Sequence, residues 1–315
     1  MEDNKNKPQI LVLIGPTAIG KTALSLQLAE TFDCEIISVD SMQVYRYMDI
    51  GTAKATQAER AMFPHHLIDV VNPDEDYDAA RFVRDASQHI KEITSRGKLA
   101  LLTGGTGLYL KSLLDGIFPE APSDKNVRDQ LKLRLENEGV DVLHDELSLC
   151  DCVSANKLHK NDTQRVLRAL EVYHTTGVPW SEHLENQKSG GAGGGLDVDA
   201  LQIGLTCDRE KLYRRINLRC ELMLNAGLKE EVQWLLNEGY GAELKSMGSI
   251  GYRHMAGYLA KEYDETEMVR LLSRDTRRYA KRQYTWFNKN ENIQWVDVAR
   301  QADVLEMVSS WRNAI

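Results

Sequence analysis

The chain has 315 residues, of which 42% are hydrophobic, which is enough for a large core and for one domain with an insertion or for two domains. No apolar stretch approaches the ~20 residues of a membrane span, the polar start does not resemble a signal peptide, and five cysteines without C-x-x-C spacing indicate reduced thiols rather than disulfides or zinc ligands. We therefore expect a cytoplasmic protein without membrane contact, and its net charge of −8 argues against a nucleic-acid partner unless cations gather locally.

The first predicted strand, residues 10–14, leads into a phosphate-binding loop. The loop matches G-x-x-x-x-G-K-[ST] with the residues Gly15-Pro16-Thr17-Ala18-Ile19-Gly20-Lys21-Thr22. A predicted helix over residues 22–30 follows, with Leu24 and Leu28 on one face. In such a strand–loop–helix, backbone N–H groups surround an anion and the lysine adds a charge. The loop predicts a di- or triphosphate ligand; a nucleoside triphosphate and a diphosphate ester with Mg²⁺ both fit.

The next two predicted strands, residues 34–40 and 98–103, end beside that loop, with a helix over residues 79–96 between them. Asp40 ends the second strand, where it either coordinates Mg²⁺ or acts as a general base; alternatively it caps the following turn. The third strand ends in Thr103-Gly104-Gly105-Thr106-Gly107, where many nucleotide hydrolases carry an aspartate that helps to hold Mg²⁺. The absence of an aspartate at the end of this strand disfavours an ATPase or a GTPase.

Two further predicted strands, residues 201–207 and 292–298, complete an α/β pattern with a mostly parallel sheet flanked by helices, as in P-loop NTPases. We expect the core at residues 8–122 and 197–315. Residues 123–196 predict a helical insertion domain, because Val127, Leu131 and Leu135 recur every four residues and residues 163–174 form a second helical pattern. A Gly-rich, flexible tract at residues 189–195 closes the insertion.

A basic segment near the end of the chain is a local cluster of cations that the net charge hides. Its cations, opposed only by Asp275, recur at helical spacing: Arg270, Arg274, Arg277, Arg278, Lys281 and Arg282. Tyr279, Tyr284, Trp286 and Phe287 are interleaved or adjacent. A cationic stripe beside aromatic side chains suits RNA, but a solvated helix face with its aromatics turned into the core explains the segment equally well.

Together these motifs resemble one family, the tRNA dimethylallyltransferases, also called tRNA isopentenyltransferases. The resemblance covers about residues 8 to 297. The motifs that carry it are GPTAIGKT (15–22), DSMQVYR (40–46), GTAK (51–54), GGTGLYL (104–110), DTQRVLRALE (162–171), GYR (251–253) and KRQYTWF (281–287).

The resemblance implies transfer of a dimethylallyl group from dimethylallyl diphosphate to N6 of the adenosine 3′ of certain tRNA anticodons. It implies that the phosphate loop holds the diphosphate, that Lys21 neutralises charge on it and that the Thr22 hydroxyl ligates Mg²⁺. Asp40 is implied as the general base, and Thr17 as a contact to the diphosphate or the acceptor base. Arg215 and Arg219 are further candidates for diphosphate contacts.

The resemblance also implies the residues that contact tRNA. The target adenosine has to leave the anticodon stack, through a passage lined by Asp40, Ser41, Met42, Gln43 and Thr106. In or beside the insertion, the anticodon stem-loop is gripped by Arg128, Gln164, Arg165, Val166, Leu167 and Arg168. Two later motifs add contacts through Gly248, Gly251, Tyr252 and Arg253, and through Lys281, Arg282 and Gln283.

Two other functions remain open at this point. A small-molecule kinase with ATP as phosphoryl donor explains the phosphate loop and Asp40 but leaves the basic segment unexplained. A non-catalytic RNA-binding switch that senses a nucleotide is the second. We expect a monomer, because the core is independent and an RNA substrate is asymmetric.

Overall fold

The computed structural model describes residues 7–116, 124–188 and 195–314, and it divides into two compact units. The first comprises Met1–Leu114 and Leu196–Ile315, and the second comprises Asp115–Gly195. From the sequence we expected the junctions at 122/123 and 196/197; the first of these, and all of the Gly-rich tract except Gly195, lie outside the described residues. We describe each unit by itself.

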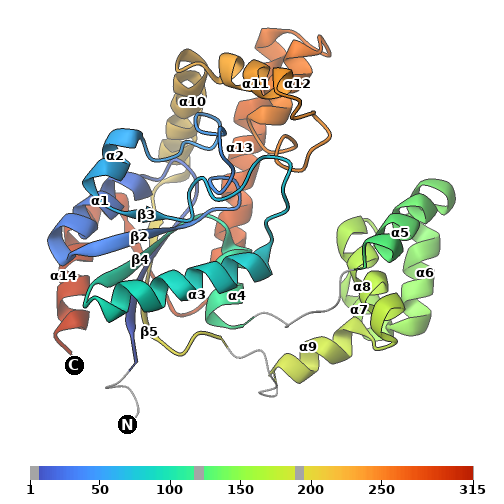
Figure 1. Cartoon of the computed structure of the whole chain (residues 1–315), viewed down its shortest axis with the longest axis horizontal. Coiled ribbons are helices and arrows are strands. Elements are labelled where there is room, and N and C mark those ends of the chain that lie inside the picture. Colours follow the sequence, from blue (N-terminus) through green and yellow to red (C-terminus); the bar gives the residue numbers. More distant parts are fainter. Residues whose placement is uncertain (1–6, 117–123, 189–194, 315) are drawn as a thin grey trace. The chain divides into compact units, whose positions relative to one another are not determined.

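The first unit is built on a parallel sheet in which β1 is central (Figure 1). The strand order is β3-β2-β4-β1-β5-β6. The strands are β1 (Gln9–Ile14), β2 (Cys34–Val39), β3 (His65–His66), β4 (Leu99–Gly104), β5 (Asp199–Thr206) and β6 (Ile293–Asp297). Residues Ile10 to Ile14 are all buried because β1 pairs with β4 and β5 and is covered on both faces. The parallel α/β class is confirmed; the two-residue β3 was not expected, because it is too short to show a pattern.

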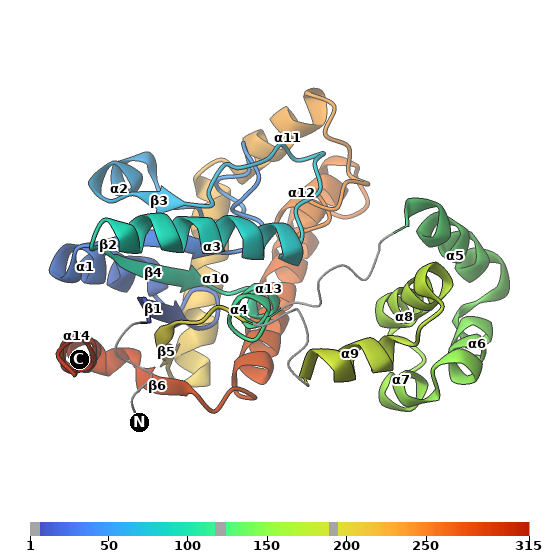
Figure 2. The same ribbon diagram turned by 60° about the horizontal axis from the view of Figure 1, so that its bottom comes forward.

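Helices lie on both sides of this sheet (Figures 1 and 2). They are α1 (Lys21–Phe32), α2 (Gln57–Met62), α3 (Ala79–Ser95), α4 (Gly107–Leu114), α10 (Arg209–Asn225), α11 (Leu228–Asn237), α12 (Tyr252–Leu259), α13 (Glu265–Phe287) and α14 (Gln301–Arg312), with a short 3₁₀ turn at Val298–Arg300. The 23-residue α13 packs against α10 and α12 and leads toward β6. It therefore places its basic stripe in the same unit as the phosphate loop.

The second unit is helical (Figure 2) and has its own hydrophobic core. Its helices are α5 (Lys125–Glu138), α6 (Val140–Cys150), α7 (Cys152–Lys157), α8 (Thr163–Thr176) and α9 (Trp180–Lys188). Leu131 is buried with Leu143, Leu147, Val166 and Leu170. Val127 and Leu135 pack against this cluster from the same face of α5, as the four-residue spacing predicts. Within the part of the chain that the structure describes, no helix in either unit is long and apolar enough to span a bilayer.

Candidate active site

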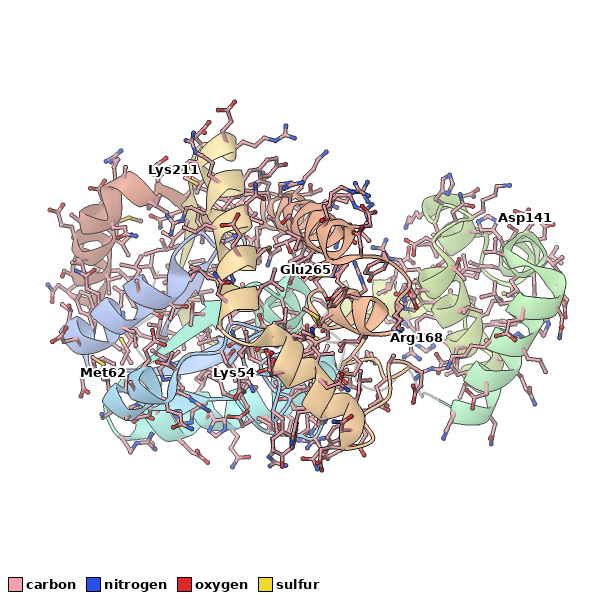
Figure 3. The ribbon with its side chains drawn as sticks, turned by 90° about the horizontal axis from the view of Figure 1, so that it is seen from above. Lys54, Met62, Asp141, Arg168, Lys211 and Glu265 are labelled. Atoms are coloured by element: carbon pink, nitrogen blue, oxygen red, sulfur yellow. The ribbon has the colours of Figure 1, made fainter. Side chains whose placement is uncertain are left out.

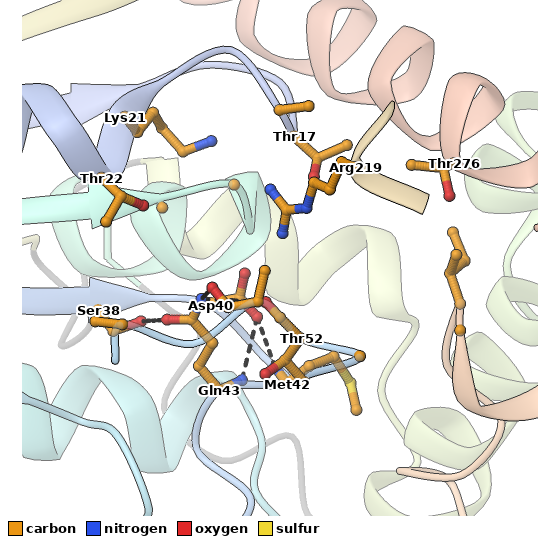
Figure 4. Close-up of a pocket in the computed structure, with 18 of the residues that line it drawn as sticks. Thr17, Lys21, Thr22, Ser38, Asp40, Met42, Gln43, Thr52, Arg219 and Thr276 are labelled. Carbon is orange, nitrogen blue, oxygen red and sulfur yellow. Dashed lines mark hydrogen bonds between the residues drawn. The ribbon is translucent and has the colours of Figure 1, made fainter. Parts of the chain in front are cut away.

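A cavity of about 810 Å³ opens where β1, β2 and β4 end (Figure 4). Because these strands are parallel, their carboxyl ends meet at one edge of the sheet, where α/β proteins place their ligands. The lining comes from the phosphate loop, the turn after Asp40, the segment 51–53, the end of β4, α10, the motif before α12 and the inner face of α13. Motifs far apart in the sequence therefore share one cavity.

The phosphate loop presents only part of its length to this cavity. Thr17, Ala18, Gly20, Lys21 and Thr22 line it, whereas Gly15, Pro16 and Ile19 are buried and anchor the loop between β1 and α1. The Lys21 ammonium donates to the carbonyls of Gly15 (2.9 Å) and Pro16 (3.0 Å). Gly20, the residue before α1, adopts a left-handed conformation with φ of 109°. The first free N–H groups of the helix follow Gly20 directly. These features suit an anion.

Cations on α10 add to the positive charge of the loop. Arg219 lines the cavity, and the Arg215 guanidinium lies against Gly20, where a Cβ atom would approach it to 3.0 Å. Burial and, to a smaller extent, the charge of Arg219 lower the pKa of Lys21 to about 7, and the charge of Asp40 opposes the shift. Burial likewise lowers the pKa of Arg219. An anionic ligand would offset the cost of burying these charges, so the cavity suits a diphosphate or triphosphate.

Asp40 both caps a turn and faces the cavity (Figure 4). Its Oδ1 accepts the N–H groups of Met42 (2.8 Å) and Gln43 (3.3 Å), which fixes the carboxylate at the end of β2. Burial raises the pKa of Asp40, while these two hydrogen bonds and the charges of Lys21 and Arg219 oppose the rise. The two interpretations of Asp40 from the sequence are therefore compatible: the turn orients a carboxylate that can accept a proton.

Polar side chains continue from Asp40 along the lining. Thr106 Oγ1 accepts the N–H of Ser41 (3.0 Å), which joins the end of β4 to the turn after β2. Gln43 Oε1 accepts the Ser38 hydroxyl (2.9 Å), and Gln43 Nε2 donates to the carbonyls of Thr52 (3.3 Å) and Ala53 (3.4 Å). Ser41, Met42 and Gln43 all line the cavity; Thr106 supports it from behind.

Gln283 on α13 braces the phosphate loop from the inner face of the helix. Its Oε1 accepts the N–H of Thr17 (2.9 Å), and its Nε2 donates to the carbonyl of Gly105 (3.0 Å). A Cβ atom on Gly105 would lie 2.1 Å from Nε2, so this approach requires a glycine at position 105. Both ends of the Gln283 amide are used within the chain, and the residue is buried.

Apart from Arg282, which lines the cavity, the arginines of the basic segment lie on α13 outside the cavity lining. Asp275 accepts from Arg253 (2.8 Å), Arg274 (2.8 Å) and His254 (3.2 Å), which holds its pKa well below the usual range. Arg277 bonds to Asn217, and Arg282 lies over the ring of Tyr279. Phe287 is buried and Tyr284 packs against Trp295, whereas Trp286 is 37% exposed. The aromatic side chains thus turn partly into the core while most of the arginines remain accessible.

The residues of the segment 248–253, which leads into α12, lie partly in the cavity lining and partly in the core. Gly251 and Arg253 line the cavity, and Gly248 is exposed outside it. Tyr252 is fully buried, and its hydroxyl donates to Glu231 on α11 (2.6 Å). Its side chain therefore reaches neither the surface nor the cavity.

In the helical unit, two arginines share one buried carboxylate. Glu171 on α8 forms ion pairs with Arg128 of α5 (3.0 Å) and Arg168 of α8 (2.9 Å), and Figure 3 labels Arg168 on that helix. Arg165 pairs with Asp162 (3.4 Å), and Gln164 lies in the first turn of the same helix. Val166 is fully buried and Leu167 packs against the core of this unit, so neither presents its side chain as an exposed contact.

Oxygen atoms near the phosphate loop fit a shared Mg²⁺ ion better than an all-protein metal site. Across residues 7–116, 124–188 and 195–314, no group of three or more His, Cys, Asp or Glu side chains is arranged to hold a metal. Mg²⁺ in phosphate sites takes few protein ligands and shares phosphate oxygens and waters. Thr22 and Asp40 face the cavity, as does Thr103, whose buried Oγ1 has no hydrogen-bond partner among the described residues. Sequence reasoning missed Thr103 as a candidate, although its position at the end of a predicted strand was a usable signal.

Comparisons with known proteins agree over nearly the whole chain. A family model described as IPP transferase matches residues 43–290, and one described as isopentenyl transferase matches residues 8–68. The chain is 54% identical to the tRNA dimethylallyltransferase of Desulfotalea psychrophila, covering 98% of this chain and 96% of that protein. It is 48% identical to the enzyme of the same name from Desulfosudis oleivorans, with coverage of 96% and 94%.

Solved structures give the same result. The full-length tRNA isopentenylpyrophosphate transferase of Bacillus halodurans matches with a TM-score of 0.71 at 38% identity, covering 96% of each chain. A eukaryotic dimethylallyltransferase acting on tRNA matches with a TM-score of 0.77 at 31% identity, covering 92% of this chain and 73% of that one.

Proposed function

The chain belongs to the tRNA dimethylallyltransferase family, and from that premise we propose how its cavity transfers a dimethylallyl group from dimethylallyl diphosphate to N6 of the adenosine 3′ of a tRNA anticodon. The family predicted from the motifs is confirmed, and the kinase alternative is disfavoured. The observation that carries the proposal is the carboxylate of Asp40, which shares one cavity with Lys21 and Arg219.

The donor's diphosphate occupies the phosphate loop in this proposal. Within the loop 15–22, the free N–H groups at the start of α1 and the Lys21 ammonium face the diphosphate, and Arg215 and Arg219 on α10 add charge. The Thr22 hydroxyl would hold Mg²⁺, which would neutralise charge on the diphosphate; Thr103, whose hydroxyl has no partner among the described residues, also lines the cavity. Thr17, whose N–H is tied to Gln283, keeps its hydroxyl available to the donor or the acceptor base.

Asp40 accepts the proton of the reaction. The N6 lone pair attacks the allylic carbon, the C–O bond to the diphosphate breaks, and the diphosphate leaves with the bonding electrons. An adenine amine is a weak nucleophile because its lone pair is delocalised into the ring, so removing its proton during attack assists the step. Burial, which raises the pKa of Asp40, makes this carboxylate a stronger base than an exposed one.

The acceptor adenosine enters as an extruded base. Ser41, Met42 and Gln43 form its side of the cavity, with Thr106 fixing the turn behind them. Exposed cations on α13 and around Gly248 to Arg253 contact the RNA backbone, and Arg128, Gln164, Arg165 and Arg168 of the helical unit contact the anticodon stem-loop. We further propose that the chain acts as a monomer in the cytoplasm, where its tRNA substrate is found.

A single assay tests the proposal. Purified protein is incubated with Mg²⁺, unmodified tRNA and either dimethylallyl diphosphate or ATP, and the tRNA nucleosides are analysed by mass spectrometry. We expect prenylated adenosine with the first donor only. Phosphate release from ATP without prenylation would instead support a kinase or a nucleotide-sensing switch.

A further inference from the structure

Glu231 lies outside the cavity but holds one of its walls. Its Oε2 accepts the N–H groups of Asp49 (3.0 Å) and Ile50 (2.8 Å), and its Oε1 accepts that of Gly51 (3.2 Å). Three successive N–H groups that point at one anion form a nest, a backbone arrangement that usually binds a ligand anion. Here a side chain from α11, about 180 residues away in sequence, takes the place of the ligand.

The same carboxylate also joins a second wall. Glu231 Oε1 accepts the hydroxyl of Tyr252 (2.6 Å), whose buried ring lies against Gly51 so closely that a Cβ atom on Gly51 would stand 2.4 Å from it. Gly251, next to Tyr252, lines the cavity, as do Gly51, Thr52 and Ala53. Glu231 therefore ties two separate segments of the lining together.

From the nest, hydrogen bonds continue to the reacting centre. The carbonyls of Thr52 and Ala53 accept Gln43 Nε2, and the N–H of Gln43 donates to Asp40 Oδ1. On its other side the segment is held by Lys54, which bonds to Asp49 (2.5 Å) and Asp69 (2.6 Å) and is labelled in Figure 3. The position of the 49–53 segment thus sets where Gln43 and the Asp40 turn lie.

We propose that Glu231 is a positioning residue of the transfer reaction, which acts by holding the 49–53 segment and, through Gln43, the Asp40 turn in their reactive geometry. This inference rests on the proposed function. The Glu231 carboxylate accepts from four donors, which are three backbone N–H groups and the Tyr252 hydroxyl. A glutamine at position 231 would place its own N–H groups opposite some of these donors, where no hydrogen bond can form. The phosphate loop is not part of this chain of contacts.

The decisive variant is Glu231→Gln, with Tyr252→Phe as a milder one that keeps the ring on Gly51 and removes only the hydroxyl. Glu230→Gln is the matched control, because Glu230 is the exposed neighbour on the same helix. We expect Glu231→Gln to lower kcat by about tenfold, since hydrogen bonds to a charged group are lost, with the KM for dimethylallyl diphosphate unchanged. Tyr252→Phe should lower kcat less, and Glu230→Gln should behave as wild type.

Hydrogen–deuterium exchange gives a readout independent of activity. The amides of Asp49, Ile50 and Gly51 should exchange faster in Glu231→Gln than in wild type. Unchanged protection, or faster exchange with wild-type kcat, would overturn the inference, and so would a KM that rises while kcat holds. If Glu231→Gln does not fold, a wild-type kcat in Tyr252→Phe decides against it. A wild-type protein that does not prenylate tRNA at all refutes the proposed function instead.

Discussion

Lys21 should take up a proton when the donor diphosphate binds. Its pKa of about 7 without a bound anion leaves about one tenth of the lysine protonated at pH 8. A diphosphate beside the ammonium favours the charged form and returns the pKa toward its ordinary value of 10.5. Binding at pH 8 should therefore take up about 0.9 proton, whereas at pH 6, where the lysine is already about nine-tenths protonated, uptake should fall to about 0.1.

Calorimetric titration with dimethylallyl diphosphate, without tRNA, measures this uptake when it is repeated in buffers of different ionisation enthalpy at fixed pH. The Lys21→Met variant supplies the background from all other groups. An uptake at pH 8 that is equal in the wild type and the variant would refute the reasoning. The pH dependence of stability gives a second check. Because the pKa of Lys21 is lower in the folded protein than in the unfolded chain, the charged lysine destabilises the fold, with its full effect below pH 7. The free energy of unfolding, measured without donor, should therefore rise with pH between about 7 and 10.5.

Three further variants test the remaining roles. Asp40→Asn should bind tRNA normally and lower turnover by about a hundredfold or more, as loss of a general base does; near-normal single-turnover rates would remove it as the base. Replacing Arg278 and Arg282 with alanine should weaken tRNA binding and reduce the salt slope by about one for each lost phosphate contact, and an unchanged slope would exclude this face. Glu171→Gln should weaken stem-loop binding several-fold while Glu146→Gln, which disturbs a comparable ion pair with Arg134, should not; equal effects in filter binding would contradict the prediction.

The sheet and the phosphate loop could be predicted because their signals are local. A buried strand such as 10–14 is a continuous apolar run, and the loop that follows has a fixed spacing set by the anion it surrounds. Helices α5 and α8 could likewise be predicted, because their apolar residues recur at helical spacing. In the structure these residues pack into one cluster.

The long-range contacts of the site could not be predicted in this way. Nothing local marks Gln283 as a brace for Thr17, 266 residues away, or Glu231 as the anion of a backbone nest. The motif containing Tyr252 was visible, but its spacing does not tell whether the ring faces the RNA or the core, and the structure buries it. Sequence patterns specify which face of an element is apolar; they do not specify which distant element covers it.

The two hydrogen bonds of Gln283 restrict where insertions and deletions can occur in this chain. Each residue of an α-helix turns the chain by about 100°, so inserting or deleting one residue in α13 before position 283 would rotate the Gln283 amide away from Thr17 and Gly105. Length variation among relatives should therefore collect in the connections on either side of this helix and spare its interior. An aligned set of sequences can be inspected for that pattern of gaps without any further experiment.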